Sequence, residues 1–323
     1  MNPLAYIQPK SVSDARREAG LTGSRYFAGG IDLLGELKDD LLPVDRLVNV
    51  KGLPGLSGIE ESGTSWRIGA NTPVAAIAGH AGLAGAVPGL AEAAGHVGSP
   101  QIRNRATLGG NLAQHSRCWY YRHRDVSCLK NGGSTCYARE GESKYHSLFT
   151  GNTCISPVVS NLAVALAALD ATVRVHTRDG EQAWSIDRLY EDAWDNPTAH
   201  NALRSDDLIL GVDIPRAPAS RRSAYRQLSE KAEFDWALVS CSVALDVVGG
   251  RIQSPRIVFG ALSPVPHRAT EAETLLAGAE PAPALFAQAA EAALAGAEPT
   301  PHNQYKVPQA QTLLRRILAD LTA

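Results

Sequence analysis

The sequence predicts an α+β fold with a larger N-terminal part and a smaller C-terminal domain. In the N-terminal part, strand-like segments lead toward paired glycines at two places, with alanine-rich helical segments between them. After a Pro- and Arg-rich link at residues 216–222, three strand-like segments are followed by helices. We therefore expect the chain to divide near this link.

The chain has 323 residues and a formal charge of −2, which gives no electrostatic case for binding to nucleic acid or to an anionic membrane. We interpret the basic residues Arg117, Arg122, His123 and Arg124 as a solvated or interface-facing group. The first residues lack the pattern of an export signal, and no segment reaches the ~18 apolar residues of a membrane span. We expect a cytoplasmic location by default, with co-export on a partner's twin-arginine signal as the alternative.

The first 73 residues predict a helix, three strands and one glycine turn. The helix covers residues 12–20 with Ser11 or Ser13 as its cap, and the strands include residues 45–50 and 66–69. Another strand enters Gly29-Gly30 before a helix, a geometry that lets backbone N–H groups approach a phosphate. Thr72 is expected to cap the next helix, with Pro73 at its first position.

A second glycine turn lies about 80 residues after the first. The alanine-rich residues 74–97 predict helices, and residues 102–106 lead into Gly109-Gly110. Two such turns could hold one long ligand between them.

Four of the five cysteines lie in an irregular segment after the second turn. Nine residues separate Cys118 from Cys128, seven separate Cys128 from Cys136, and seventeen separate Cys136 from Cys154. A loop this long in a compact domain needs something to hold it, and clustered cysteines without an export signal favour metal or redox chemistry over disulfides. The close pairs typical of structural zinc are absent, so the spacing leaves an iron–sulfur cluster, zinc and free thiols open.

The remaining sequence completes both parts. Residues 162–169 are apolar, residues 172–176 alternate as a strand before the hairpin signal Asp179-Gly180, and residues 208–214 form another strand. The C-terminal domain is expected to have strands at residues 223–228, 237–248 and 256–262 and helices at 269–276, 283–295 and 308–321. Within it, Cys241 is interpreted as a buried structural thiol.

Both glycine turns resemble motifs of one family. Residues 27–34 are similar to the first FAD motif, and residues 102–111 to the second, of the FAD-binding medium subunits of molybdenum hydroxylases. Residues 236–240 and 303–308 resemble the C-terminal domain of that family. The resemblance implies an FAD-binding domain of the vanillyl-alcohol-oxidase type over 1–218, with lobes at 1–55 and 56–218, and a carbon-monoxide-dehydrogenase-flavoprotein-like domain over 219–323.

The cysteine loop, residues 115–156, resembles a subgroup with an extra [4Fe–4S] cluster, which includes periplasmic aldehyde oxidoreductase and 4-hydroxybenzoyl-CoA reductase. The loop is more similar to that of periplasmic aldehyde oxidoreductase. The resemblance implies Cys118, Cys128, Cys136 and Cys154 as cluster ligands. The implied FAD contacts are Tyr26, Phe27, Ala28, Gly29, Gly30, Ile31, Asp32, Leu33, Leu34, Thr107, Gly109, Gly110, Asn111, Asn161, Ile209, and Arg226 or Lys231.

Two positions depart from the family pattern. Ile31 replaces a usual Thr or Ser and removes a hydroxyl from the first motif. Asn161 replaces a usual Asp, which keeps a hydrogen-bonding group but removes a charge.

The resemblance implies an oxidoreductase subunit with no catalytic residue of its own. It would work in a heterotrimer with a molybdenum-cofactor large subunit and a small subunit carrying two [2Fe–2S] clusters, and FAD would pass electrons to an external acceptor. The alternatives are the FAD subunit of a 4-hydroxybenzoyl-CoA-reductase-like enzyme, a self-contained flavin oxidase and a non-enzymatic metal-stapled interaction module.

Overall fold

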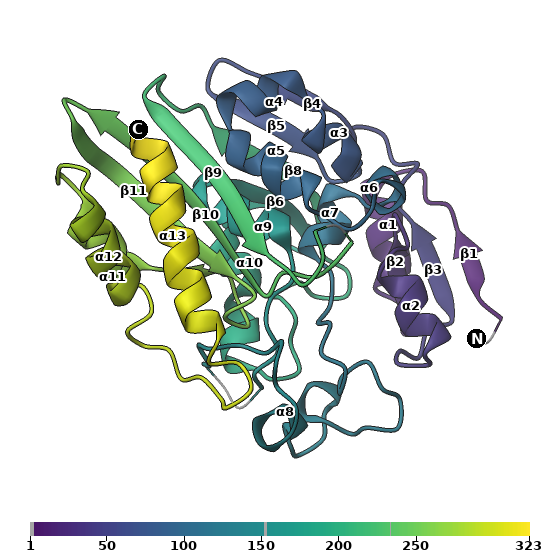
Figure 1. The fold of residues 1–323 in the computed structure, drawn as a ribbon. Coiled ribbons are helices and arrows are strands. Elements are labelled where there is room, and N and C mark those ends of the chain that lie inside the picture. Colours follow the sequence, from purple (N-terminus) through teal and green to yellow (C-terminus); the bar gives the residue numbers. More distant parts are fainter. Residues whose placement is uncertain (1–2, 152–153, 233) are drawn as a thin grey trace.

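A computed structural model describes residues 3–151, 154–232 and 234–323. Its strands form sheets of three, five and four members (Figure 1). The small N-terminal sheet lies at one side of the molecule and the C-terminal sheet at the other.

The three-stranded sheet is parallel, with the order β1-β3-β2. Its strands are β1 (Ala5–Ile7), β2 (Ser24–Phe27) and β3 (Arg46–Asn49), and helices α1 (Val12–Ala19) and α2 (Leu33–Lys38) accompany them. The Ser11 hydroxyl accepts a hydrogen bond from the Asp14 N–H at 3.1 Å, which confirms Ser11 as the start of α1. Gly29 and Gly30 lie between β2 and α2.

The five-stranded sheet has the order β4-β5-β8-β6-β7, and all its pairs are antiparallel. The predicted hairpin is confirmed, because Thr177 pairs with Gly180 across the turn. The strands are β4 (Ile59–Glu61), β5 (Ser65–Gly69), β6 (Thr172–Thr177), β7 (Gly180–Ser185) and β8 (Leu208–Pro215).

Short helices connect and cover this sheet. They are α3 (Val74–Ala78), α4 (Ala81–Ala86), α5 (Pro88–Gly95), α6 (Pro100–Arg105), α7 (Leu108–Leu112), α9 (Asn161–Ala168) and α10 (Ile186–Asp195). The prediction that Thr72 caps the first of them is wrong: α3 begins after Pro73, and the Thr72 hydroxyl donates to the Gly58 carbonyl at 3.0 Å. The apolar residues 162–168 lie in α9, which is buried on nearly every side, and Leu169 caps its C-terminus.

The four-stranded sheet is antiparallel, with the order β12-β11-β10-β9. Its strand β10 is buried along most of its length, because α13 packs against one face of the sheet and α9 and α5 against the other. Cys241 in β10 is fully buried, as predicted. The elements are β9 (Arg221–Leu228), β10 (Val239–Val248), β11 (Arg251–Gly260), β12 (His267–Arg268), α11 (Thr270–Leu276), α12 (Pro283–Ala292) and α13 (Lys306–Thr322).

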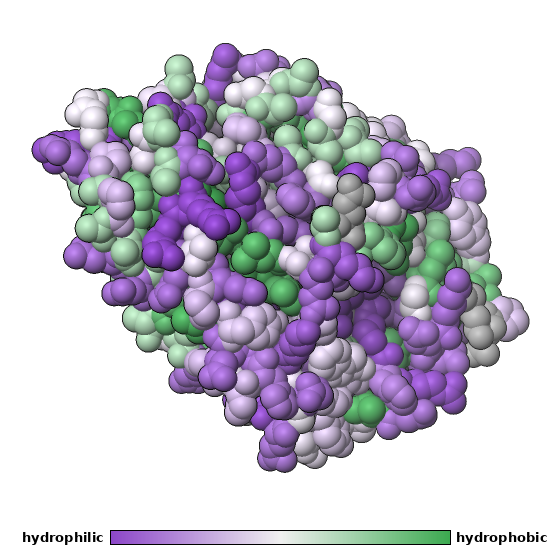
Figure 2. Space-filling model, viewed as in Figure 1, coloured by the Kyte–Doolittle hydropathy of each residue, from purple (hydrophilic) through white to green (hydrophobic). Residues whose placement is uncertain are grey.

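The cysteine segment extends from the lower edge of the molecule in Figure 1, around the label α8. In the described part of this segment, regular structure is limited to the 3-10 turn η1 (Leu129–Asn131) and the single-turn α8 (Tyr137–Glu140). On the face shown in Figure 2, hydrophobic residues form small groups among hydrophilic ones. Among the described residues, no helix combines the length and apolar character needed to cross a bilayer.

Candidate cofactor site

The two glycine turns meet in space. A Cβ atom on Gly29 would clash with the carbonyl oxygen of Arg105 and would lie 3.1 Å from the Cα of Ala106, so the first turn approaches the chain just before the second turn. Gly30 has a φ of 74°, which favours glycine. Glycine is therefore required at position 29 by the Arg105–Ala106 backbone and favoured at position 30 by its backbone conformation.

A cavity of about 730 Å³ opens where the turns meet, and we call it the first cavity. Its volume falls within the roughly 300–1,000 Å³ of small-molecule and cofactor sites. The predicted FAD-contacting residues on its wall are Tyr26, Ala28, Gly29, Gly30, Ile31, Asp32, Leu33, Thr107, Gly109, Gly110, Asn111, Asn161 and Ile209.

The first turn presents unpaired backbone donors. Within the described chain, the N–H groups of Gly29, Gly30, Ile31 and Asp32 have no protein acceptor. Successive N–H groups of this kind form anion-binding concavities in proteins. The Ile31 N–H is thus available to an anion even though its side chain carries no hydroxyl.

Four predicted residues are not on this wall. Phe27 and Leu34 pack into an apolar cluster with Leu37, Val44 and Leu47. Arg226 instead lies outside the cavity, where its guanidinium pairs with Glu92 at 2.8 Å, and Lys231 is exposed. The structure does not bring these four side chains to the first cavity.

Several wall residues escaped the sequence reasoning, among them three groups: His96–Gly98, Leu203–Ser205 with Asp207, and Phe234–Trp236. They come from a helix end, a loop before β8 and the β9–β10 connection, so only the tertiary fold brings them together. Among these residues, Gly98 has a φ of 48° and Phe234 a φ of 56°, and only the glycine is a residue type that indicates such backbone geometry in a sequence.

Asn161 joins the first cavity to the C-terminal sheet. Its Nδ2 donates to Tyr225 Oη and to Gln227 Oε1, both at 2.8 Å. An aspartate could donate neither bond. Asparagine at position 161 therefore supplies the donor for the Gln227 side-chain oxygen, which an aspartate could not do.

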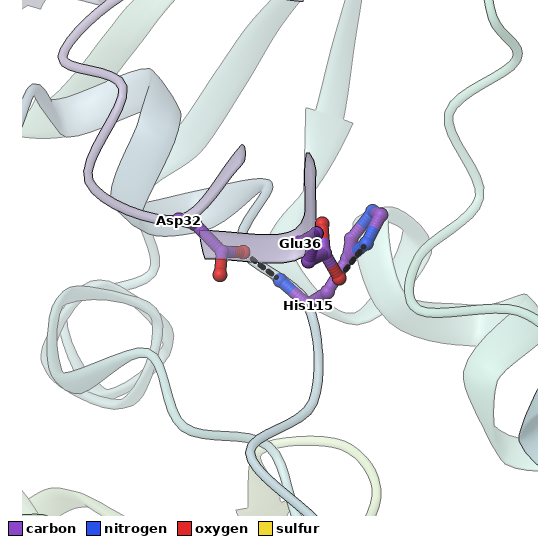
Figure 3. Close-up of side chains that lie close together, drawn as sticks. All are labelled: Asp32, Glu36 and His115. Atoms are coloured by element: carbon purple, nitrogen blue, oxygen red, sulfur yellow. Dashed lines mark hydrogen bonds and ion pairs between the residues drawn. The ribbon is translucent and has the colours of Figure 1, made fainter. Parts of the chain in front are cut away.

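Asp32, Glu36 and His115 form a polar cluster beneath the first turn (Figure 3). Asp32 Oδ2 accepts the His115 backbone N–H at 2.7 Å, and Glu36 Oε1 lies 2.9 Å from His115 Nδ1. Their ligand atoms lie within 4.8 Å of one another, a spacing compatible with a metal ion. Guanidinium groups already occupy the carboxylates, however, so we interpret the cluster as a structural bridge.

Those guanidinium groups belong to the cysteine loop. Arg117 Nη1 lies 2.9 Å and Arg122 Nη2 2.7 Å from Asp32 Oδ1. The interpretation of the basic residues as solvated or interface-facing is wrong for Arg117 and Arg122, because their side chains are only 22% and 15% exposed and pair with Asp32 of the same chain. His123 and Arg124 are exposed. Burial raises the pKa of Asp32, but the two arginines and the hydrogen bonds outweigh it and hold that pKa below its usual value.

The fully buried Glu36 extends the bridge. Its Oε1 accepts a hydrogen bond from the Tyr121 hydroxyl at 2.8 Å. The ring of His115 stacks on that of His200, with centroids 4.0 Å apart. Burial lowers the pKa of His200 well below its usual value, so this imidazole is neutral. The cysteine loop is thereby fixed to both carboxylates of the first turn and its helix.

The four clustered cysteines surround one small cavity of about 10 Å³, which we call the cysteine cavity. Its wall includes Cys118, Cys128, Cys136 and Cys154, and each thiol is free of a disulfide. Widely spaced positions of the sequence are thus brought together, as a shared metal centre requires. The four thiols lie on separate segments of the loop.

Polar groups surround these sulfur atoms. Backbone N–H groups of Tyr120 and Tyr121 hydrogen-bond to Cys118, whose pKa burial raises to about 11. His146 Nε2 lies 3.1 Å from Cys118 Sγ. A hydrogen bond between the Cys136 and Cys154 sulfurs lowers the pKa of Cys136 and raises that of Cys154. Four thiols with N–H donors form a donor set that fits an iron–sulfur cluster.

Comparisons with known proteins agree with this architecture. Residues 2–217 match the FAD binding domain in molybdopterin dehydrogenase, and residues 223–321 match the CO dehydrogenase flavoprotein C-terminal domain. The chain is 31% identical to the FAD-binding subunit of aldehyde oxidoreductase from Escherichia coli K12, covering 100% of this chain and 99% of that protein. It is 26% identical to the carbon monoxide dehydrogenase medium chain of Afipia carboxidovorans, covering 96% and 94%.

Solved structures show the same fold. Carbon monoxide dehydrogenase from Hydrogenophaga pseudoflava superposes with a TM-score of 0.78 at 25% identity, covering 98% of this chain and 96% of that one. Reconstituted CO dehydrogenase from Oligotropha carboxidovorans gives a TM-score of 0.79 at 24% identity, covering 100% and 99%.

The fold and the first cavity define a flavoprotein component of an oxidoreductase. The chain belongs to the family of FAD-binding medium subunits of molybdenum hydroxylases. The predicted family, α+β fold class and FAD cofactor are confirmed. The individual FAD contacts, the domain boundaries and the metal ligands stay predictions.

Proposed function

We propose that this chain is the electron-transfer subunit of a heteromeric molybdenum-containing oxidoreductase of the aldehyde or xanthine dehydrogenase type, and that it carries FAD and a [4Fe–4S] cluster. One observation carries the proposal. The cavity with four unpaired N–H groups and the cavity with four thiols are neighbours, and the adjacent residues Arg117 and Cys118 line one each.

In this proposal the thirteen predicted residues on the wall of the first cavity hold FAD. The N–H groups of Gly29 to Asp32 supply hydrogen bonds to the pyrophosphate, which compensates for the missing hydroxyl at Ile31. Bound FAD supplies two-electron redox chemistry, while the protein positions it and adjusts its potential. The chain itself needs no general base.

Cys118, Cys128, Cys136 and Cys154 would hold the cluster, with the N–H groups around their sulfurs adjusting its potential. The cluster supplies one-electron chemistry when bound. A large subunit with the molybdenum cofactor would oxidise the substrate, and a small subunit with two [2Fe–2S] clusters would deliver electrons to this chain for an external acceptor.

We also propose a domain boundary near residue 218. It lies between the end of β8 at Pro215 and the start of β9 at Arg221. The two FAD-binding lobes would cover 1–55 and 56–218, and the C-terminal domain 219–323.

Anaerobic purification tests the proposal through the absorbance spectrum and the FAD, iron, sulfide and zinc contents. We expect one FAD with about four iron and four sulfide per chain, and co-purification with a molybdenum-containing subunit. Zinc with no sulfide would refute the cluster, whereas a chain without flavin would indicate a metal-stapled interaction module. Turnover of a substrate by the isolated chain would indicate a self-contained flavin oxidase.

The direction of electron flow needs a separate measurement. Reduction of FAD in the purified complex by an aldehyde supports the proposal. Reduction only by a low-potential donor, with no reaction toward aldehydes or purines, would favour a 4-hydroxybenzoyl-CoA-reductase-like enzyme.

A further inference from the structure

Lys130 is the only lysine or arginine among the described residues that line the cysteine cavity. It lies in η1, between Cys128 and Cys136, and its side chain is partly buried. The described wall of this cavity includes no carboxylate. It therefore combines one ammonium group with four thiols.

Backbone carbonyl groups hold the Lys130 ammonium in place. Its Nζ donates to the carbonyl oxygens of Pro197 and Ala199 at 3.1 and 2.7 Å. These two residues follow α10, so the contacts fix η1 to a segment outside the cysteine loop. Carbonyl groups orient an ammonium group without neutralising its charge, and in the described part of the chain Nζ pairs with no carboxylate.

The charged groups that act on Lys130 belong to three of the four cysteines. Burial lowers the pKa of Lys130, whereas Cys154, Cys128 and Cys118 act in the opposite direction. A partly buried ammonium group without a carboxylate partner costs free energy unless another anionic group lies nearby. An iron–sulfur cluster held by four thiolates is such a group, because its net charge is negative.

We propose that the ammonium group of Lys130 compensates the negative charge of the bound cluster and thereby raises its reduction potential. The proposal rests on the function proposed above, because it needs a [4Fe–4S] cluster on the four thiols. Reduction by the small subunit adds one electron, and hence one negative charge, to that cluster. A fixed cation beside the cluster stabilises the more negative form and so favours reduction.

Three substitutions separate the charge of Lys130 from its hydrogen bonds. Lys130→Met removes both, Lys130→Gln removes the charge but keeps an N–H donor, and Lys130→Arg keeps both. Arg124→Gln is the matched control, because it removes the same charge from an exposed position of the same loop.

A redox titration of the full-length, anaerobically purified chain tests the proposal, with dithionite as the reductant. Electron paramagnetic resonance measures the reduced cluster, and iron and sulfide analysis measures its occupancy. At a fixed ambient potential, the ratio of reduced to oxidised cluster should fall by about threefold or more in Lys130→Met and Lys130→Gln. The ratio should stay native in Lys130→Arg and in Arg124→Gln.

Loss of iron from both neutral variants, with native iron in Lys130→Arg, would also support the proposal, because binding of the anionic cluster would then depend on the cation. Native iron and an unchanged ratio in both neutral variants would overturn it. An equal change in Lys130→Arg would overturn it too, and so would a change in Lys130→Met that Lys130→Gln does not share, because the hydrogen bonds would then account for the effect. Failure of the proposed function is distinct: the native chain itself would then contain no iron–sulfur cluster.

Discussion

Arg122 Nη2 lies 2.7 Å from Asp32 Oδ1, although 90 positions separate the two residues in the sequence. This ion pair joins the cysteine loop to the turn that carries the unpaired N–H groups of the first cavity. It is mostly buried, with side-chain exposures of 15% and 17%. The two proposed cofactor sites therefore share one structural support.

Arg122→Gln tests this support. A hydrogen bond to a charged group contributes about 1.5–3 kcal/mol, and we expect the free energy of unfolding to fall by that amount. FAD should also bind more weakly, because Asp32 then keeps only one of its two guanidinium partners, Arg117. Urea unfolding and a flavin titration measure the two effects.

Arg124→Gln is the matched control. Arg124 is 63% exposed and lies 3.5 Å from the carboxylates of Asp40 and Asp125, so its loss should change stability by less than about 0.5 kcal/mol. Equal effects of the two substitutions would contradict the role assigned to Arg122.

The same ion pairs predict a dependence of stability on pH. The pKa of Asp32 is lowered in the folded protein, so its stabilising effect is complete above the ordinary Asp pKa of about 3.9 and is lost as pH falls through the folded value. The native chain should be more stable than Asp32→Asn at pH 7, and this difference should shrink below about pH 4. Urea unfolding across pH measures it, and a constant difference would contradict the assignment.

Gly29→Ala should damage the first cavity. The new methyl group would clash with the Arg105 carbonyl, so we expect a loss of more than about 1 kcal/mol in stability and weaker FAD binding. Gly35→Ala is the matched change nearby in α2. Its Cβ meets nothing within 4 Å, so it should raise stability by about 0.4–1 kcal/mol. Thermal unfolding and a flavin titration of the two glycine variants measure these effects.

Asn161→Asp tests whether the side-chain amide of Asn161 stabilises the folded chain. The carboxylate cannot donate to Tyr225 or Gln227, and we expect a loss of about 1–3 kcal/mol in the free energy of unfolding. In a Gln227→Ala background the loss should be smaller, because one acceptor is absent. A double-mutant cycle measures this coupling, and zero coupling would refute it.

The features that were predicted correctly depend on residues that are neighbours in the sequence. The Ser11 cap, the hairpin at Asp179-Gly180 and the buried Cys241 follow from local propensity, turn chemistry and hydrophobicity. The glycine turns were visible because their backbone geometry excludes larger residues, as at Gly29.

Long-range contacts account for what the sequence could not predict. Thr72 fails as a helix cap because its hydroxyl bonds Gly58 in another segment. Arg226 is turned to Glu92, which lies 134 positions earlier in the chain. Trp236 reaches the first cavity only through the packing of the C-terminal sheet. No local pattern encodes these partners.

The iron and FAD contents of Cys128→Ser and Cys241→Ser test the central claim most directly. Both cysteines are buried, but only Cys128 lines the cysteine cavity. We predict that Cys128→Ser loses most of its iron and the broad visible absorbance of the cluster while keeping much of its FAD, and that Cys241→Ser keeps both. Unchanged iron in Cys128→Ser would contradict the account.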